Sequence, residues 1–174
     1  MKTRTIIPPF IVLLLPATLL VLASCMKAPK CPYSQSSKVA SVAEVDSIKR
    51  YLAENSITNA VQDSSGVFYV TSNSGQGSTP DVCSSIYINY SVYRFGYLTS
   101  FDSNTTPTGF ACTLGQLIDG VKKISTKIKA GSSVTMFIPP SLAYGATEMR
   151  DGNGMVILPA NSYLKFQMTI LSVQ

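Results

Sequence analysis

Residues Ser84–Tyr93, SSIYINYSVY, decide the fold class because apolar and polar side chains alternate along this stretch. One face of it contains Ile86, Ile88, Tyr90 and Val92. Such an alternation predicts a β-strand with one buried face. The same pattern returns in residues 134–138 and 164–170. The sequence therefore predicts an antiparallel sheet whose apolar face needs a cover.

A short helix between these strands can supply that cover. Val121, Ile124 and Ile128 recur at helical spacing, and Gly131 follows as the predicted C-cap. A single amphipathic helix laid across a curved sheet buries the apolar face of both elements. The expected fold class is α+β, with an antiparallel β-sheet wrapped around one short α-helix and a short N-terminal helical extension.

The extension is predicted over residues 41–79, and the main domain over residues 80–174. Ser41-Val42-Ala43-Glu44 fits a capping box, and apolar residues at helical spacing predict a helix from 42 to 54. This helix could form a dimer contact, but packing onto the following domain is the preferred interpretation. Residues 66–71, GVFYVT, predict a strand, and Pro80 marks the expected domain boundary.

The first 24 residues have the layout of a secretory signal. A basic start is followed by an apolar run over residues 6–22 and by small residues before a cysteine. Leu22-Ala23-Ser24-Cys25 resembles a lipobox, so Cys25 is the expected lipidation site and the first residue of the mature chain. The alternative is an uncleaved transmembrane anchor, although prolines interrupt the short apolar run. Residues 25–40 are then expected to form an acylated, flexible tether.

Three cysteines remain if Cys25 is acylated, so at most one internal disulfide can form. Cys31 and Cys83 could pair, but sequence alone does not establish the approach that a disulfide requires. Cys112 alternates with apolar neighbours and is interpreted as a small buried residue. The chain has no histidine and no CxxC motif, so no metal site is expected.

The basic residues give a formal net charge of +5 to the full chain. Lysines gather only in the predicted helix, at Lys122, Lys123, Lys127 and Lys129. Apolar residues interleave them, which favours a solvated helix face over nucleic-acid binding. No nucleic-acid partner is therefore expected.

Several motifs occur in a fixed order along the second half of the chain. They are Tyr90, Phe101-Asp102-Ser103, Phe110 with Leu114-Gly115, Leu117-Ile118, Ile138–Ala146 (IPPSLAYGA), Ile157-Leu158-Pro159 and Leu164 with Phe166. In this order the chain resembles the FKBP-type peptidyl-prolyl isomerases. The segment before them is similar to the N-terminal extensions of lipoprotein members of that family. The resemblance implies rotation of X-Pro bonds in an apolar pocket, without covalent catalysis. It implies no cofactor.

The resemblance also assigns roles to individual residues. The implied catalytic residues are Tyr90, Phe101, Asp102, Tyr144 and Phe166, and the implied substrate-binding residues are Phe110, Leu117, Ile118, Val121, Ile157 and Leu158. The aromatic residues would form walls around the proline ring, and Tyr144 would donate its hydroxyl to a substrate carbonyl. Leu117 and Ile118 would present backbone groups, whereas Ile157 and Leu158 would close the side. For each apolar position, plain core packing remains the competing interpretation.

Two departures from the family pattern bear on the activity. Val121 stands where the pocket floor is usually tryptophan, so macrolide ligands are expected to bind only weakly. The loop over residues 148–155 is long and is expected to overhang the pocket.

The role of Asp102 has an alternative as well, because this residue could merely cap a turn. The alternative to an active isomerase is therefore a catalytically weak or inactive prolyl-peptide-binding or chaperone module.

The expected partners follow from the signal segment and the resemblance together. They are proline-containing exported proteins, unfolded or folding, and a membrane reached through the N-terminal lipid. The residues after Cys25, MKAPK, lack an acidic run. The expected location is thus the cell envelope, lipid-anchored and facing the periplasm.

Overall fold

The computed structural model describes residues 30–174, and residues 31–174 form one compact unit. Its helices are α1 (Val42–Glu54) and α2 (Asp119–Ser125), with 3₁₀ turns η1 (Leu114–Gln116) and η2 (Pro140–Leu142). The main sheet contains β1 (Val61–Gln62), β2 (Phe68–Asn73), β3 (Ser85–Arg94), β4 (Asp102–Asn104), β5 (Phe110–Thr113), β6 (Ser133–Ile138) and β9 (Leu164–Val173). A separate hairpin is made by β7 (Met149–Arg150) and β8 (Val156–Leu158).

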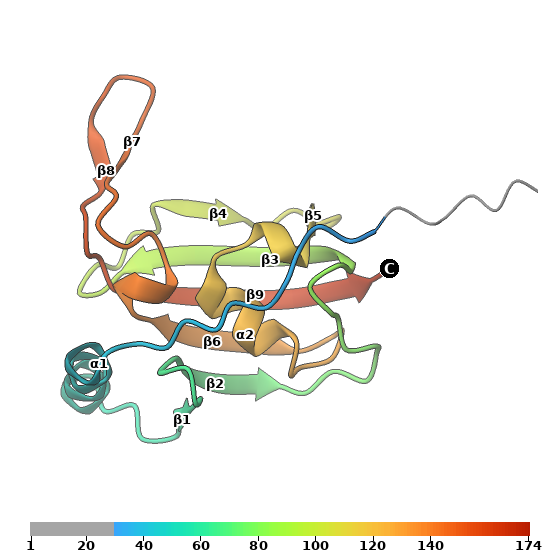
Figure 1. The fold of residues 1–174 in the computed structure, drawn as a ribbon, viewed down its shortest axis with the longest axis horizontal. Coiled ribbons are helices and arrows are strands. Elements are labelled where there is room, and N and C mark those ends of the chain that lie inside the picture. Colours follow the sequence, from blue (N-terminus) through green and yellow to red (C-terminus); the bar gives the residue numbers. More distant parts are fainter. Residues whose placement is uncertain (1–29) are drawn as a thin grey trace, which may run out of the picture. The chain divides into compact units, whose positions relative to one another are not determined.

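The main sheet is antiparallel, with the strand order β1-β2-β6-β9-β3-β4 (Figure 1). Its centre is the long ladder between β3 and β9, which runs from Ile86 opposite Val173 to Arg94 opposite Leu164. β5 and β4 pair with successive halves of β3. The predicted α+β architecture is confirmed.

The alternating residues of the three predicted strands form the core. The buried residues from these strands are Ile86, Ile88, Val92, Val134, Met136, Ile138, Leu164, Phe166, Met168 and Ile170. α2 lies across them and contributes Val121 and Ile124, both fully buried. Gly120 permits this approach, because a Cβ there would lie 2.4 Å from Cγ2 of Ile138.

The predicted end of the helix was wrong. α2 stops at Ser125 with Thr126 as its C-cap, and Gly131 lies in a later turn where its amide donates to Ile170 O at 2.7 Å. The Thr126 hydroxyl donates to Lys122 O and so competes with the helical hydrogen bonds. The next amides bond three residues back, which tightens the chain and still carries Ile128 into the core.

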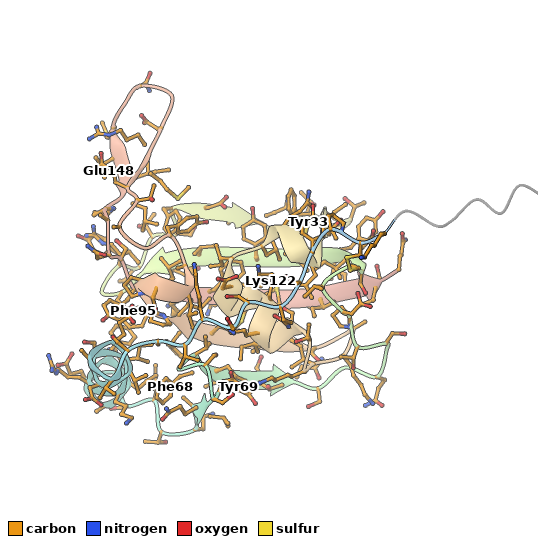
Figure 2. The ribbon with its side chains drawn as sticks, in the orientation of Figure 1. Tyr33, Phe68, Tyr69, Phe95, Lys122 and Glu148 are labelled. Carbon is orange, nitrogen blue, oxygen red and sulfur yellow. A yellow bond between two sulfur atoms is a disulfide. The ribbon has the colours of Figure 1, made fainter. Side chains whose placement is uncertain are left out.

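α1 begins with the predicted capping box at Ser41 and Glu44 and covers the opposite face of the sheet. Ile48 and Leu52 pack there with Phe68 and Phe137, whose side chains point away from α2 because side chains alternate along a strand. Phe95 also lies against this helix, as Figure 2 shows, and its ring stacks on Tyr51. The helix therefore packs onto the domain, as the preferred interpretation held.

Residues Cys31–Ala40, here called the strap, correct the expectation of a flexible tether. The strap runs along α2 (Figure 1) and is attached at both ends. A disulfide joins Cys31 to Cys83, with their Cα atoms 5.8 Å apart, and the Ala40 amide donates to Ser65 O at 2.9 Å. Composition marked this segment as a linker, but its partners lie far away in the sequence.

The four lysines expected to form a solvated helix face do so only in part: Lys127 and Lys129, which follow the end of α2, are exposed, whereas Lys122 and Lys123 within α2 are half-buried. Only 13% of the Lys122 side chain is exposed, and its ammonium lies 2.7 Å from Asp119. Lys123 donates to Ser36 O, and Lys127 pairs with Asp63, whose side chain is 8% exposed. Figure 2 shows Lys122 beside the strap. Among these contacts, the bond from Lys123 to Ser36 joins the strap to α2, and the ion pair between Lys38 and Asp119 adds a second connection.

The predicted signal segment and Cys25 lie outside the described residues. Within residues 30–174, no helix combines the length and the apolar character that crossing a membrane requires.

Candidate functional site

A cavity of about 270 Å³ opens on the α2 side of the sheet. It lies between β3, β9, the edge strands, the chain entering α2 and the loop after η2. Its walls are formed by Ile88, Tyr90, Val92, Asp102, Phe110, Gln116, Leu117, Ile118, Tyr144 and Phe166. The lining is mostly apolar and aromatic, as in sites that bind small apolar groups.

Three aromatic rings from neighbouring strands form one wall. The Tyr90 ring is stacked on Phe166 with centroids 5.7 Å apart, and Phe110 meets it edge-on at 6.0 Å. The strand register explains this grouping, since Val92 pairs with Phe166 and Ile88 pairs with Phe110. Both arrangements are favourable for aromatic pairs, so the wall is preformed.

One hydrogen-bonded pair gives this wall a polar edge. The Tyr90 hydroxyl donates to the Asp102 carboxylate, at 3.3 and 3.4 Å from its two oxygens. The pairing of Val92 with Asp102 places the carboxylate beside the ring. Burial raises the pKa of Tyr90, and the Asp102 carboxylate raises it further. Tyr90 therefore stays protonated at neutral pH and keeps donating.

Tyr144 faces the cavity from the loop that follows η2. The Pro140 carbonyl accepts the amides of Ala143 at 3.0 Å and Gly145 at 2.8 Å, which closes a tight turn around the tyrosine. Gly145 has φ +59°, a conformation that glycine adopts without strain. Burial raises the pKa of Tyr144, with a further contribution from the Asp102 carboxylate. Its hydroxyl is thus a neutral donor at physiological pH.

The chain entering α2 supplies the remaining side of the cavity. Ile118 is the N-cap of α2, and its carbonyl accepts the amides of Val121 and Lys122 at 3.1 Å. The amide of an N-cap residue has no partner within its own helix. Ile118 thus lines the cavity, and its amide has no partner within α2.

The structure brings together most of the residues that the resemblance singles out, namely Tyr90, Asp102, Phe110, Leu117, Ile118, Tyr144 and Phe166. Val121 instead belongs to the core, where it is fully buried, and Phe101 is half-buried and packs against that core. Leu158 is also buried, and Ile157 is 38% exposed. Neither of these two lines the cavity, and the functional roles of all these positions remain predictions.

The loop over residues 148–155 does not overhang the cavity, so that expectation was wrong. It belongs to the β7–β8 hairpin, which extends away from the main sheet (Figure 1). Within the hairpin, Arg150 binds Glu148 at 2.6 Å and the Gly154 carbonyl at 2.6 Å. These bonds close the loop upon itself rather than onto the pocket.

Three residues of the cavity wall were not among the predicted site residues. Ile88 and Val92 share the face of Tyr90 in the alternating strand, so that pattern contained the signal for them. Gln116 gave no such signal. Its position depends on η1, where its side chain accepts the Thr113 amide at 3.0 Å.

The groups around the cavity suit noncovalent binding of a substrate rather than covalent chemistry. The ionisable groups in its wall are Tyr90, Asp102 and Tyr144. Cys112 lies outside the wall, and burial raises the pKa of its thiol to about 11, which keeps it protonated and unreactive. Among the residues that the structure describes, no cluster of histidine, cysteine or carboxylate side chains could hold a metal ion.

Comparison with known proteins agrees with this geometry. A family model described as FKBP-type peptidyl-prolyl cis-trans isomerase matches residues 77–171. The chain is 32% identical over 110 residues to the FKBP-type peptidyl-prolyl cis-trans isomerase FkpA of Buchnera aphidicola, covering 63% of this chain and 43% of the relative. It is 28% identical over 111 residues to FkpA of Escherichia coli K12, and the match covers 64% of this chain and 39% of the relative. It thus spans less than half the length of these relatives.

Shorter relatives and solved structures agree as well. FK506-binding protein 1 of Dictyostelium discoideum is 32% identical over 104 residues, covering 56% of this chain and 89% of the relative. The crystal structure of FkpA from Escherichia coli aligns with a TM-score of 0.62 and 25% identity, covering 76% of this chain and 60% of the other. The crystal structure of AtFKBP13 aligns with a TM-score of 0.57 and 22% identity, and the alignment covers 67% of this chain and 100% of the other. It shows the same fold.

Proposed function

This chain belongs to the FKBP-type peptidyl-prolyl cis-trans isomerase family, and from that premise we propose that it accelerates cis-trans rotation about X-Pro bonds in exported proteins. The observation that carries the proposal is the aromatic-lined cavity, which combines an apolar wall with neutral hydroxyl donors. A proline ring is a compact apolar group that fits such a wall.

The reaction requires little chemistry but a specific environment. Rotation about an X-Pro bond faces a barrier of about 20 kcal/mol and takes tens of seconds unaided. The planar imide is dipolar through resonance, whereas the twisted transition state is less dipolar. An apolar pocket therefore favours the twisted form relative to water. About 4 kcal/mol of preferential stabilisation gives roughly a thousandfold acceleration.

The cavity residues divide this task between them. Tyr90, Phe110 and Phe166 hold the proline ring, and the Asp102 carboxylate fixes the Tyr90 hydroxyl at the pocket edge. Tyr144 donates to the carbonyl of the twisting bond or of a neighbouring residue. The backbone amide at Ile118 offers a second donor to the substrate chain. No bond to the protein forms at any step.

We also propose that the mature chain is a lipoprotein, acylated at Cys25 and facing the periplasm. The signal layout of residues 1–24 and the tetrad Leu22–Cys25 support acylation. The disulfide between Cys31 and Cys83 supports export, because such bonds persist in oxidising compartments. Its substrates would then be proline-containing proteins that fold in the cell envelope, and macrolide ligands would bind weakly.

Residues 26–174 contain the whole described unit and are the segment to test. The measurement is the rate of cis-to-trans conversion in an X-Pro peptide, for wild type beside Tyr144→Phe and Phe166→Ala. We expect acceleration in wild type and a loss of about tenfold or more in both variants. A folded wild type with no acceleration would overturn the isomerase proposal, and peptide binding without turnover would select the binding module.

A further inference from the structure

Glu44 accepts hydrogen bonds from two segments that lie far apart in the sequence, the start of α1 and η2. It is the third residue of α1, and its Oε2 atom accepts the Ser41 amide at 2.9 Å in the capping box. The same carboxylate reaches η2. Its Oε1 atom accepts the Ser141 amide and its Oε2 atom accepts the Ser141 hydroxyl, both at 2.9 Å. One side chain thus joins the extension to the segment that precedes the pocket loop.

The Ser141 amide needs this acceptor. The first amides of a helix have no partner within the helix, and Pro140 at the first position of η2 has no amide hydrogen. Ser141 therefore carries the first unsatisfied donor of η2, and Glu44 satisfies it. Burial raises the pKa of Glu44, but the hydrogen bonds from Ser141 and Ser41 outweigh burial, so the pKa is lowered and the carboxylate is charged at neutral pH.

η2 in turn holds the turn that carries Tyr144. The Pro140 carbonyl accepts the Ala143 and Gly145 amides on either side of the tyrosine. Leu142 anchors the inner side of η2, where it is fully buried, whereas Ser141 is exposed and is tied to α1 through Glu44. A shift of η2 at Ser141 would therefore move the backbone from which the Tyr144 ring projects into the cavity.

α1 is a firm support for this contact. Ile48 is fully buried and Leu52 is 6% exposed, and both pack on the sheet face opposite to the cavity. The Ser41 hydroxyl bonds to Glu44 at this helix start as well, accepting the Glu44 amide at 3.3 Å and donating to Oε2 at 3.0 Å. Glu44 thus attaches the exposed residue Ser141 of η2 to a helix whose position is fixed by packing.

We propose that Glu44 is a positioning residue for the pocket, which fixes η2 and so holds the Tyr144 hydroxyl where the substrate carbonyl binds. This role rests on the proposed isomerase function. It extends the site to a residue of the N-terminal extension, outside the matched residues 77–171.

The test compares two changes in the same capping box. Glu44→Ala removes both bonds to η2 together with part of the cap, whereas Ser41→Ala removes the bonds of the Ser41 hydroxyl but keeps the Ser41 amide and both Ser141 bonds to the Glu44 carboxylate. We expect Glu44→Ala to lower kcat/KM about fivefold, the value of one positioned hydrogen bond. Ser41→Ala should lower the melting temperature to a similar extent and leave kcat/KM unchanged.

A double variant shows whether the effect acts through Tyr144. In a Tyr144→Phe background the hydroxyl is gone, so adding Glu44→Ala should cost little further kcat/KM. Equal losses in Glu44→Ala and Ser41→Ala, or fully additive losses in the double variant, would overturn the positioning role.

A readout without turnover separates this proposal from the isomerase proposal. The NMR signals of the Tyr144 ring should shift or broaden in Glu44→Ala and remain unchanged in Ser41→Ala. An inactive wild type that shows this NMR difference would refute the isomerase activity and support the positioning role. Unchanged Tyr144 signals in Glu44→Ala would refute the positioning role whatever the activity.

Discussion

The strap and the β7–β8 hairpin are both excursions from the sheet, but they are held in opposite ways. The strap has no regular secondary structure and is attached at both ends and between them, by the disulfide to Cys83, by hydrogen bonds and by the ion pair between Lys38 and Asp119. The hairpin has a short ladder of two residue pairs with a register shift between Met149 and Arg150, and Arg150 bonds within its loop. Its tip is open, with 69% of Met155 exposed.

The difference shows that secondary structure and attachment are separate properties. A segment without helix or strand can be part of the folded unit when distant residues satisfy its polar groups. A hairpin contributes to that unit through the residues that it buries, here Leu158 and Met149, while its exposed tip contributes little. Changes in the strap should therefore lower the stability of the whole domain, and equivalent changes at the exposed tip of the hairpin should not.

The largest effect is expected from the disulfide. Replacing Cys31 and Cys83 by serine opens a loop with a sequence separation of 52. Chain entropy then predicts a loss of about 4 kcal/mol in the free energy of unfolding. Urea denaturation of the double variant measures this loss, with Cys112→Ala as the control for removing a thiol. An unchanged midpoint would mean that the strap adds nothing to the fold.

A pair of glycine substitutions compares the two regions directly. A Cβ at Gly115 would lie 2.2 Å from the Tyr33 ring, whereas a Cβ at Gly152 in the hairpin would meet nothing within 4 Å. We expect Gly115→Ala to cost about 1 to 3 kcal/mol, because the strap must move. Gly152→Ala should change the free energy of unfolding by less than about 0.5 kcal/mol. Equal effects in urea denaturation would contradict the contrast between the regions.

A smaller effect is expected from Asp119, which faces the strap from the first turn of α2. Burial raises its pKa, but hydrogen bonds from Lys122 and Ser36 and the charges of Lys122 and Lys38 outweigh burial and lower the pKa below its usual 3.8. A lowered carboxyl pKa stabilises the fold above the unfolded-state pKa, and this contribution disappears as the pH falls through the folded-state pKa.

Asp119→Asn should therefore lower the free energy of unfolding by about 1 kcal/mol at pH 7. Wild type and variant should converge as the pH falls below about 3.8, which urea denaturation across pH 2.5 to 7 can follow. Asp46→Asn is the matched control, because its pair with Lys49 is exposed on both sides. A gap between Asp119→Asn and wild type that persists at low pH would rule out the ionic contribution.

The sequence predicted those features that depend on local periodicity. The alternation in β3, β6 and β9 gave the buried face of the sheet, and the capping box gave α1 its bounds. The motifs also gave most of the cavity wall, since strand register brings Tyr90, Phe110 and Phe166 together.

The features that could not be predicted depend on contacts between distant residues. The polar residues of the strap resemble those of a linker until Gln35 is seen to bond Thr126, 91 positions later. The lysines of the predicted helix resemble a solvated face, but Lys123 donates to Ser36 O, 87 positions earlier. Likewise, the bond between Glu44 and Ser141 spans 97 positions. No periodicity reports such a pairing, so these features require the structure.

The smallest effect is expected in the hairpin, where the resemblance and the geometry make different predictions. The resemblance implies that Ile157 closes the side of the pocket, but 38% of the residue is exposed and it does not line the cavity. Ile157→Ala should then change the free energy of unfolding by less than about 0.5 kcal/mol. Its kcat/KM for a short X-Pro peptide should fall less than twofold, whereas Phe166→Ala, in the wall, should cost about tenfold or more. Comparable losses in the two variants would mean that the hairpin reaches the substrate when one is bound.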